Sequence, residues 1–216
     1  CSVIMEGRGL PAKAAFPDSF SYGNEAVETV SYDPEGAKKL LEESGWKDTD
    51  GDGYADKDGQ KLTINWLTYP TRLEQPKLAE YAQATLKEIG IDVVVNNTSD
   101  HMTYAADGNF DVYVSSTTTA PTGDPEYFFT STVVGPKNYG KYENKEVTAL
   151  TEKLHQAFEP EERAKLATEL QQKILDDDGF FFVSHLNMGI VTKSNVKGMA
   201  AHLCDYYEIT ADLDVE

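Results

Sequence analysis

The sequence predicts an α/β fold, in which a mainly parallel sheet is flanked by helices and the C-terminal third is rich in helix. The middle of the chain alternates short segments of period two with helical patterns, in the order strand–helix–strand–helix–strand. The last third carries amphipathic helical patterns one after another. No internal repeat or low-complexity linker interrupts the chain, so we expect a single domain over 1–216.

The N-terminal part is expected to be an irregular lead-in over 1–31, because proline and glycine punctuate it without periodicity, and 8–31 should follow the surface. A helix should begin after Asp33, a good capping residue, with Pro34 at its first position. Its apolar stripe consists of Ala37, Leu40 and Leu41. An α/β core over 32–186 and a tail over 187–216 complete the predicted organisation.

The core elements follow from their periodicity. Strands are predicted near 62–66, 91–95 and 110–114, and helices over 74–89 and 100–106 join them. Short connections between alternating strands and helices are typical of right-handed crossovers, so the three strands should be parallel.

The last third begins with Asp124, which should cap a short helix, and continues with helices over 144–158 and 160–174. The apolar stripe of the first long helix is Val147, Leu150, Leu154 and Phe158, and that of the second is Ala164, Ala167, Leu170 and Ile174. The run Phe180–Val183 predicts a buried strand.

Charge limits the function classes. The 216 residues hold 19 Lys and Arg against 37 Asp and Glu, a net charge of −18. A field of that sign repels nucleic acid and anionic lipid, so neither is expected as a partner. No apolar run approaches the ~20 residues of a membrane span.

The two cysteines, Cys1 and Cys204, form no disulfide framework and no zinc-binding spacing. An N-terminal cysteine has two interpretations: the acylated start of a bacterial lipoprotein, or the cut end of a fragment. Val3, Ile4 and Met5 resemble the end of a helix rather than a polar tether, which favours the fragment.

An acidic loop is the sharpest local motif. Asp48, Asp50, Asp52 and Asp56 have the spacing of positions 1, 3, 5 and 9 of a calcium-binding EF-hand loop. Position 12, where a bidentate glutamate normally completes the shell, is Gly59. The alternatives are a possible Ca²⁺ site and a solvated turn without cofactor, and the missing ligand favours the turn.

Enzymatic chemistry is not indicated. The four histidines, His101, His155, His185 and His202, form no metal-ligand pair, so we interpret them as surface or core residues. No nucleophile elbow, phosphate-binding loop or dinucleotide fingerprint occurs. We therefore expect no catalytic residues.

A polar loop over 115–125 follows the third predicted strand and leads into a helix. Ligands of open α/β sheets bind at this carboxyl edge. The expected ligand contacts are Thr117, Thr118, Thr119, Pro121, Thr122 and Asp124. Threonines that merely continue the strand, with Asp124 acting only as a cap, are the alternative.

The chain as a whole resembles the C-terminal lobe of the family 5 solute-binding proteins, the peptide/nickel class of bacterial ABC importers. The matching segments occur in the family's order: Tyr32-Asp33-Pro34-Glu35, the acidic hairpin Asp50-Gly51-Asp52-Gly53, Ile89-Gly90-Ile91-Asp92-Val93, Phe110-Asp111, Asp124-Pro125 and Pro160-Glu161-Glu162-Arg163. The resemblance implies a periplasmic-binding-protein-like lobe that captures a solute by hinge closure without chemistry on it.

The resemblance also implies which residues meet the solute. The 115–124 loop would be this lobe's share of the cleft. Members of the family often carry a tryptophan where this chain has Thr118, and peptide binders an acid where it has Pro121. Nickel binders have a histidine soon after, yet 126–142 contains none. Hydrogen bonds rather than aromatic stacking are therefore expected.

The expected function is capture of a short peptide or peptide-like solute for an ABC importer. A nickel or metal-chelate binder is the alternative within the family, and a Ca²⁺-stabilised structural or adhesion module is the alternative outside it. The resemblance implies ABC permease subunits as partners of a monomer. It also implies an extracellular location, as an anchored lipoprotein or in the periplasm, for the complete protein.

Overall fold

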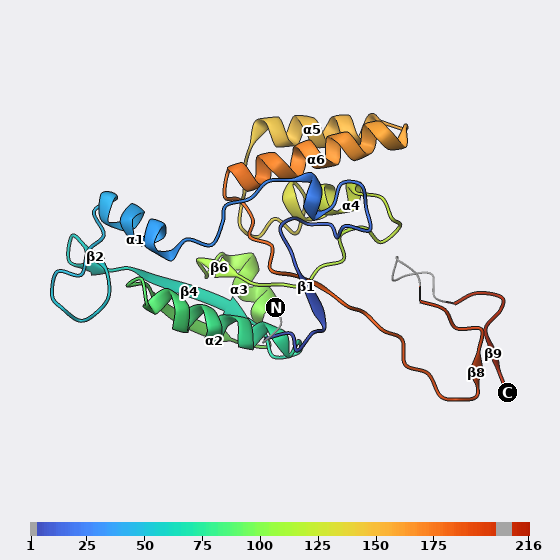
Figure 1. The fold of residues 1–216 in the computed structure, drawn as a ribbon, viewed down its shortest axis with the longest axis horizontal. Helices are drawn as coiled ribbons and strands as arrows, with labels where there is room; N and C mark the ends of the chain where they lie inside the picture. Colours follow the sequence, from blue (N-terminus) through green and yellow to red (C-terminus); the bar gives the residue numbers. More distant parts are fainter. Residues whose placement is uncertain (1–3, 202–208) are drawn as a thin grey trace. The chain divides into compact units, whose positions relative to one another are not determined.

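The computed structural model describes residues 4–201 and 209–216 (Figure 1). Its contacts group into two compact units: Val30–Ser116, and the segments that precede and follow it. We call them the inserted unit and the flanking unit and describe each by itself. The single-lobe division into 1–31, 32–186 and 187–216 stays a prediction. Cys1 and Cys204 lie outside the described residues.

The inserted unit is built on a three-stranded sheet of β4 (Thr63–Thr68), β5 (Asp92–Asn97) and β6 (Val112–Tyr113). The strand order is β5-β4-β6 and both pairings are parallel. The predicted parallel sheet is thus confirmed, with a third strand shorter than expected. Parallel pairing places the carboxyl ends of all three strands at one edge.

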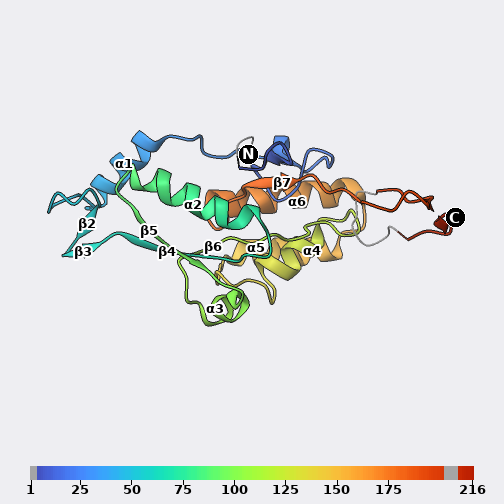
Figure 2. The same ribbon diagram turned by 90° about the horizontal axis from the view of Figure 1, so that it is seen from below.

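Two helices make the crossovers between these strands. Helix α2 (Glu74–Lys87) packs along β4 and β5, and α3 (His101–Asp107) lies between β5 and β6 in sequence (Figure 2). Gly108 ends α3 in a left-handed conformation with φ of 72°, which glycine adopts without strain. Both helices fall where the periodicity predicts them.

Helix α1 (Pro34–Glu43) begins as expected, because the Asp33 carboxylate accepts a hydrogen bond from the Gly36 N–H at 2.9 Å. The apolar stripe of this helix is not buried. No residue of α1 is buried, and Leu40 is 64% exposed. Periodicity marks a face suited to burial, but an element must cover that face before it is buried. The short hairpin of β2 (Asp56–Lys57) and β3 (Gln60–Lys61) follows.

The flanking unit centres on α5 (Lys145–Gln156) and α6 (Pro160–Asp176), which lie side by side (Figure 1). The short helix α4 (Glu126–Phe128) contacts α5 and continues into the π-helical turn η2 (Phe129–Val133). The predicted inward positions are confirmed for Val147, Leu150, Leu154, Ala167, Leu170 and Ile174. Phe158 was expected on the same stripe but is 87% exposed. The chain leaves helical geometry at Ala157, so the period of 3.6 no longer applies.

The lead-in does not follow the surface as expected. Phe16 is fully buried and packs against Phe128 and Phe129 in an aromatic core. The segment also contains β1 (Gly9–Pro11) and the 3₁₀ turn η1 (Asn24–Ala26), and β1 pairs antiparallel with β7 (Ser184–Leu186). Burial of large aromatic side chains contributes more favourable free energy than ordering an irregular backbone segment costs, so this segment packs into the core.

The predicted buried strand over Phe180–Val183 is also corrected. Phe180 and Phe182 pack against the core of the flanking unit, whereas Phe181 is 86% exposed. The strand pairing begins only at β7. Near the C-terminus β8 (Val196–Lys197) pairs antiparallel with β9 (Asp214–Val215). No helix in the described ranges is both long and apolar enough to cross a bilayer.

Candidate functional site: a polar loop and its anchor

The polar loop predicted to bind ligand leads into α4. Thr117 and Thr122 are exposed, and Thr118 and Thr119 are partly exposed. Pro121, by contrast, is buried in the flanking unit. The structure therefore places the threonine hydroxyls at or near the surface and Pro121 away from it.

A tyrosine from the lead-in fixes the turn before α4. Gly123 has a φ of 80°, which permits the turn, and its carbonyl accepts a hydrogen bond of 2.9 Å from the Tyr22 hydroxyl. Burial raises the pKa of Tyr22 to about 12, and the negative charge of Asp124 adds to the effect. The hydroxyl therefore keeps its proton and remains a donor.

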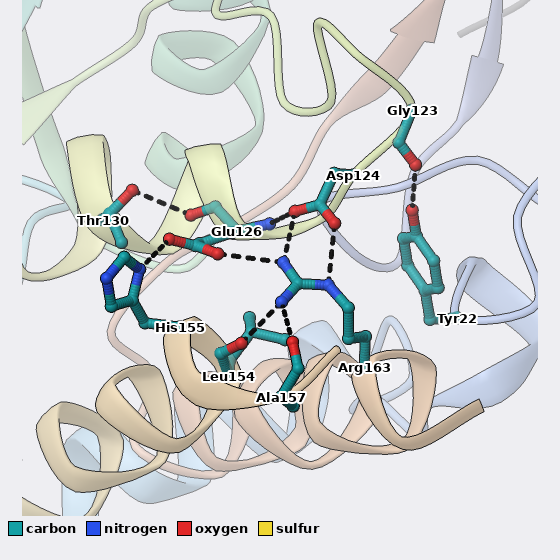
Figure 3. A network of polar contacts seen from close by, with 9 residues as sticks. All are labelled: Tyr22, Gly123, Asp124, Glu126, Thr130, Leu154, His155, Ala157 and Arg163. Carbon is teal, nitrogen blue, oxygen red and sulfur yellow. Dashed lines mark hydrogen bonds and ion pairs between the residues drawn. The ribbon is translucent and has the colours of Figure 1, made fainter. Parts of the chain in front are cut away.

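The turn is followed by an ion pair between Asp124 and Arg163 of α6 (Figure 3). The Arg163 Nε lies 2.8 Å from Oδ2, and Nη2 lies 2.7 Å from Oδ1, so the guanidinium grips both oxygens of the carboxylate. Partial burial by itself would raise the pKa of Asp124. Hydrogen bonds from Arg163 and from the Glu126 N–H outweigh it and lower that pKa.

The other donors of Arg163 reach three further groups. Nη2 also donates to Glu126 Oε2 at 2.9 Å, and Nη1 donates to the carbonyls of Leu154 and Ala157 at 2.6 Å each. These carbonyls lie at the C-terminal end of α5, where the Leu154 carbonyl also accepts a bond of 3.3 Å from the Ala157 N–H. All five N–H groups of Arg163 are thus used, and they join the loop, α4, α5 and α6.

A histidine closes the network on its outer side. His155 Nδ1 lies 2.6 Å from Glu126 Oε1, and Thr130 donates from its hydroxyl to the Glu126 carbonyl at 3.0 Å (Figure 3). Burial alone would raise the pKa of Glu126, but hydrogen bonds from His155 and Arg163 lower it. We call Asp124, Glu126, His155 and Arg163 the anchor network.

The anchor network changes how Asp124 is understood. Both of its oxygens are engaged by Arg163, so it holds the loop in place as well as opening α4. Its expected contact with a ligand stays a prediction. Sequence reasoning missed Arg163 as the partner. The Pro160-Glu161-Glu162-Arg163 segment marked a helix start, but nothing in it indicated a bond across 39 positions.

The acidic loop brings three of its four predicted aspartates together. Carboxylate oxygens of Asp48, Asp50 and Asp56 lie within 4.8 Å of one another. Asp52 is not part of this group, and its Oδ2 lies 2.8 Å from Lys61 Nζ. That hydrogen bond lowers the pKa of Asp52 and raises the pKa of Lys61.

The loop is also organised by its own hydrogen bonds. Asp48 accepts from the N–H groups of Gly51 and Gly53 at 2.7 and 3.0 Å. Asp56 accepts from both the N–H and the hydroxyl of Thr49. These bonds are those of an acidic turn, and the Ca²⁺ site stays a prediction.

Comparison with known proteins agrees with the expected family. Residues 2–140 match the family model for bacterial extracellular solute-binding proteins, family 5, middle part. The oligopeptide-binding protein AppA of Bacillus subtilis is 28% identical over 208 residues, which cover 93% of this chain and 38% of AppA. The nickel-binding periplasmic protein of Escherichia coli is 33% identical over 129 residues, 59% of this chain and 24% of that protein.

A solved structure supports the same relationship. The structure of Bacillus subtilis AppA in complex with a nonapeptide superimposes with a TM-score of 0.77 and 25% identity, covering 93% of this chain and 41% of that one. The chain thus spans about two fifths of the length of such relatives. The family model matches well over half of the sequence, and the chain belongs to the family 5 bacterial extracellular solute-binding proteins.

Proposed function

We propose that this chain supplies part of the solute cleft of an ABC importer's binding protein, and that the solute is a short peptide or a peptide-like molecule. The observation that carries the proposal is the polar loop with exposed hydroxyls at Thr117 and Thr122, held by the anchor network. Membership of a solute-binding family, rather than of an enzyme family, and the likeness to an oligopeptide-binding protein support it.

Capture in this proposal needs no covalent step. Threonine hydroxyls both donate and accept hydrogen bonds, which suits the alternating N–H and C=O groups of a peptide. The anchor network orders the loop before the solute arrives, so less conformational entropy is lost on binding. Closure against a second lobe would then remove water from the solute.

A nickel complex or another metal chelate is the second candidate solute. It is supported by the nickel-binding relative of Escherichia coli. Hydroxyls and amide groups of the loop would bind the organic part of such a chelate rather than the metal ion. The two candidate solutes therefore differ in whether they contain a metal ion, and both would bind to the same loop.

The proposal extends to partners and location. We propose ABC permease subunits as the docking partners of a monomeric binding protein, and a lipoprotein anchor or a periplasmic location for the complete molecule. The extracellular character of the family supports this setting, and the net charge of −18 disfavours anionic polymers as solutes.

Calorimetric titration with tri-alanine and with nickel–histidine tests the proposal. The wild-type chain should bind tri-alanine at millimolar concentration. The double variant T117V/T122V should bind at least about fivefold more weakly, because each lost hydrogen bond contributes roughly 1 kcal/mol. T192V, at another exposed threonine, is the matched control. Equal affinities of the wild type and T117V/T122V would contradict the proposal, and binding of nickel–histidine alone would favour the second candidate.

A further inference from the structure

Aspartate followed by glycine can react with its own backbone. The glycine nitrogen can attack the carboxyl carbon of the aspartate, because glycine has no side chain to shield that nitrogen. The sequence holds five such pairs: Asp50-Gly51, Asp52-Gly53, Asp58-Gly59, Asp107-Gly108 and Asp178-Gly179. The reaction needs a glycine N–H without a hydrogen bond and an accessible carboxyl group, so the structure decides which pair reacts.

The two pairs of the acidic loop are protected by hydrogen bonds. The N–H groups of Gly51 and Gly53 donate to the Asp48 carboxylate at 2.7 and 3.0 Å, so neither nitrogen can attack until its bond breaks. The Asp52 carboxylate also accepts a hydrogen bond from Lys61, which lowers its pKa. Ring closure needs the protonated carboxyl group, whose hydroxyl leaves as water, so this lowered pKa slows the reaction further.

The two pairs at helix ends are protected in the same way. Gly108, which ends α3, donates its N–H to the Ala105 carbonyl at 3.2 Å. Gly179 comes shortly after α6 and donates its N–H to the Ile174 carbonyl at 3.0 Å. Both bonds close the end of a helix, so freeing either nitrogen would also open the last helical turn.

The pair at the tip of the β2–β3 hairpin differs from the other four (Figure 2). Asp58 and Gly59 are both exposed and form a two-residue turn, with φ of 55° and 75°. Among the residues that the structure describes, the Gly59 N–H has no hydrogen-bond partner, and the Asp58 carboxylate has neither a hydrogen bond nor an ion pair. A Cβ added at Gly59 would meet no atom within 4 Å, so the turn has room to rotate.

We propose that Asp58-Gly59 is a modification site, at which the folded chain forms isoaspartate faster than at its other Asp-Gly pairs. The Gly59 nitrogen bonds to Asp58 Cγ, the bond from Cγ to the carboxyl hydroxyl breaks, and the hydroxyl leaves as water with the proton of that nitrogen. Water then opens the five-membered succinimide. Opening at the backbone carbonyl gives isoaspartate, and opening at the side-chain carbonyl restores aspartate. The net reaction is an isomerisation without oxidant or reductant, and it does not rest on the proposed function.

The modification changes the hairpin that carries it. In isoaspartate the chain runs through Cγ, which adds one carbon atom to the backbone of the turn. The hairpin pairs Lys57 with Gln60 and Asp56 with Lys61, and the register of a hairpin is fixed by the length of its loop. The lengthened turn therefore no longer fits this pairing.

Peptide mapping of the 216-residue chain tests the proposal. The chain is kept for weeks at about pH 6, where a fraction of exposed carboxyl groups is still protonated. Chymotrypsin, which cleaves after aromatic residues and leucine, then releases 47–54 with both pairs of the acidic loop and 55–62 with Asp58-Gly59. Electron-transfer fragmentation identifies isoaspartate in each peptide. Per pair, it should form at least about fivefold faster in 55–62, because breaking one hydrogen bond costs about 1 kcal/mol.

Unfolding and two variants separate the effect of structure from that of sequence. In denaturing urea both peptides should react at similar rates, because no N–H is then held by the fold. D48A removes the acceptor of the Gly51 N–H and should raise the rate at Asp50-Gly51 about fivefold in the folded chain. D58E should leave 55–62 without the modification, since a glutamate would have to close a larger ring.

Four results would overturn the proposal: no isoaspartate in 55–62, a rate in 47–54 that equals or exceeds it, a preference for 55–62 that persists in urea, or a rate at Asp50-Gly51 that D48A does not change. The first two would show that an open N–H does not select the site. The last two would show that the hydrogen bonds of the folded chain are not what protects the other pairs.

Discussion

Arg163 holds Asp124 by both carboxylate oxygens, with Nε 2.8 Å from Oδ2 and Nη2 2.7 Å from Oδ1. The pair joins the start of α4 to α6. The polar loop lies immediately before Asp124 in the sequence. The side chain of Arg163 is only 15% exposed, and its other N–H groups bond Glu126 and the end of α5. Arg163, like Tyr22, therefore positions the loop from a place that is distant in the sequence.

Replacing this arginine should destabilise the flanking unit. R163K keeps the charge but cannot form the two-pronged bond or reach both α5 carbonyls. We expect the free energy of unfolding to fall by about 2 kcal/mol in a urea titration. R72K, whose guanidinium is on the surface of the inserted unit, should change it by less than about 0.5 kcal/mol. Equal stability of R163K and wild type would refute the anchoring role.

Gln171 should be equally intolerant of change. It is fully buried in α6, where its Oε1 accepts from the Ala15 N–H at 3.1 Å and its Nε2 donates to the Tyr22 carbonyl at 2.8 Å. Q171L leaves both backbone groups buried without partners, so unfolding should cost about 2–4 kcal/mol less. Q156L at the exposed end of α5 is the control. If Q171L lowers the free energy of unfolding by less than about 1 kcal/mol, the hydrogen bonds of Gln171 are not what holds the lead-in in place.

His185 predicts an acid-sensitive stability. Its Nε2 lies 3.1 Å from Asn24 Oδ1, and burial lowers its pKa, although the charge of Asp18 opposes this. Because the folded state binds the proton less readily than the unfolded state, stability is fully present above about pH 6.5 and declines as the pH falls below it. H185Q keeps an amide donor without titrating, so its unfolding free energy should vary less between about pH 6.5 and 5. Parallel pH profiles for H185Q and wild type would rule this out.

The acidic loop should not need calcium. Its carboxylates already accept hydrogen bonds from the loop, Asp52 pairs with Lys61, and Gly59 stands where the closing ligand belongs. Raising Ca²⁺ to about 5 mM, above the dissociation constants of weak extracellular sites, should shift the melting temperature by less than about 1 °C. A rise of several degrees that Mg²⁺ does not reproduce would establish the calcium site.

Local patterns predicted most of the fold because most helices and strands form where the periodicity of the sequence places them. The three parallel strands, α2, and the inward positions Leu150 and Leu154 follow directly from periodicity. The errors lie where tertiary contacts decide the outcome. Leu40 has a helical apolar pattern without an element to cover it, and Phe16 lies in a segment without any pattern, yet fills the core.

The candidate site was predictable only in part, for the same reason. The polar loop could be located from the strand before it and the helix cap after it. The bond from Arg163 to Asp124 spans 39 residues, and the bond from Tyr22 to Gly123 joins the lead-in to the loop. No local spacing carries that information. Short-range motifs identified the loop, and packing determined what holds it.

The central claim is that the polar loop over 117–123 meets a peptide solute. Backbone amide NMR of the chain during a titration with tri-alanine tests it most directly. We predict saturable shifts for the amides of 117–120, 122 and 123, since Pro121 has no N–H, while those of the acidic loop around Asp48–Asp56 stay unchanged. Unmoved amides over 117–123 at saturating tri-alanine would contradict the account.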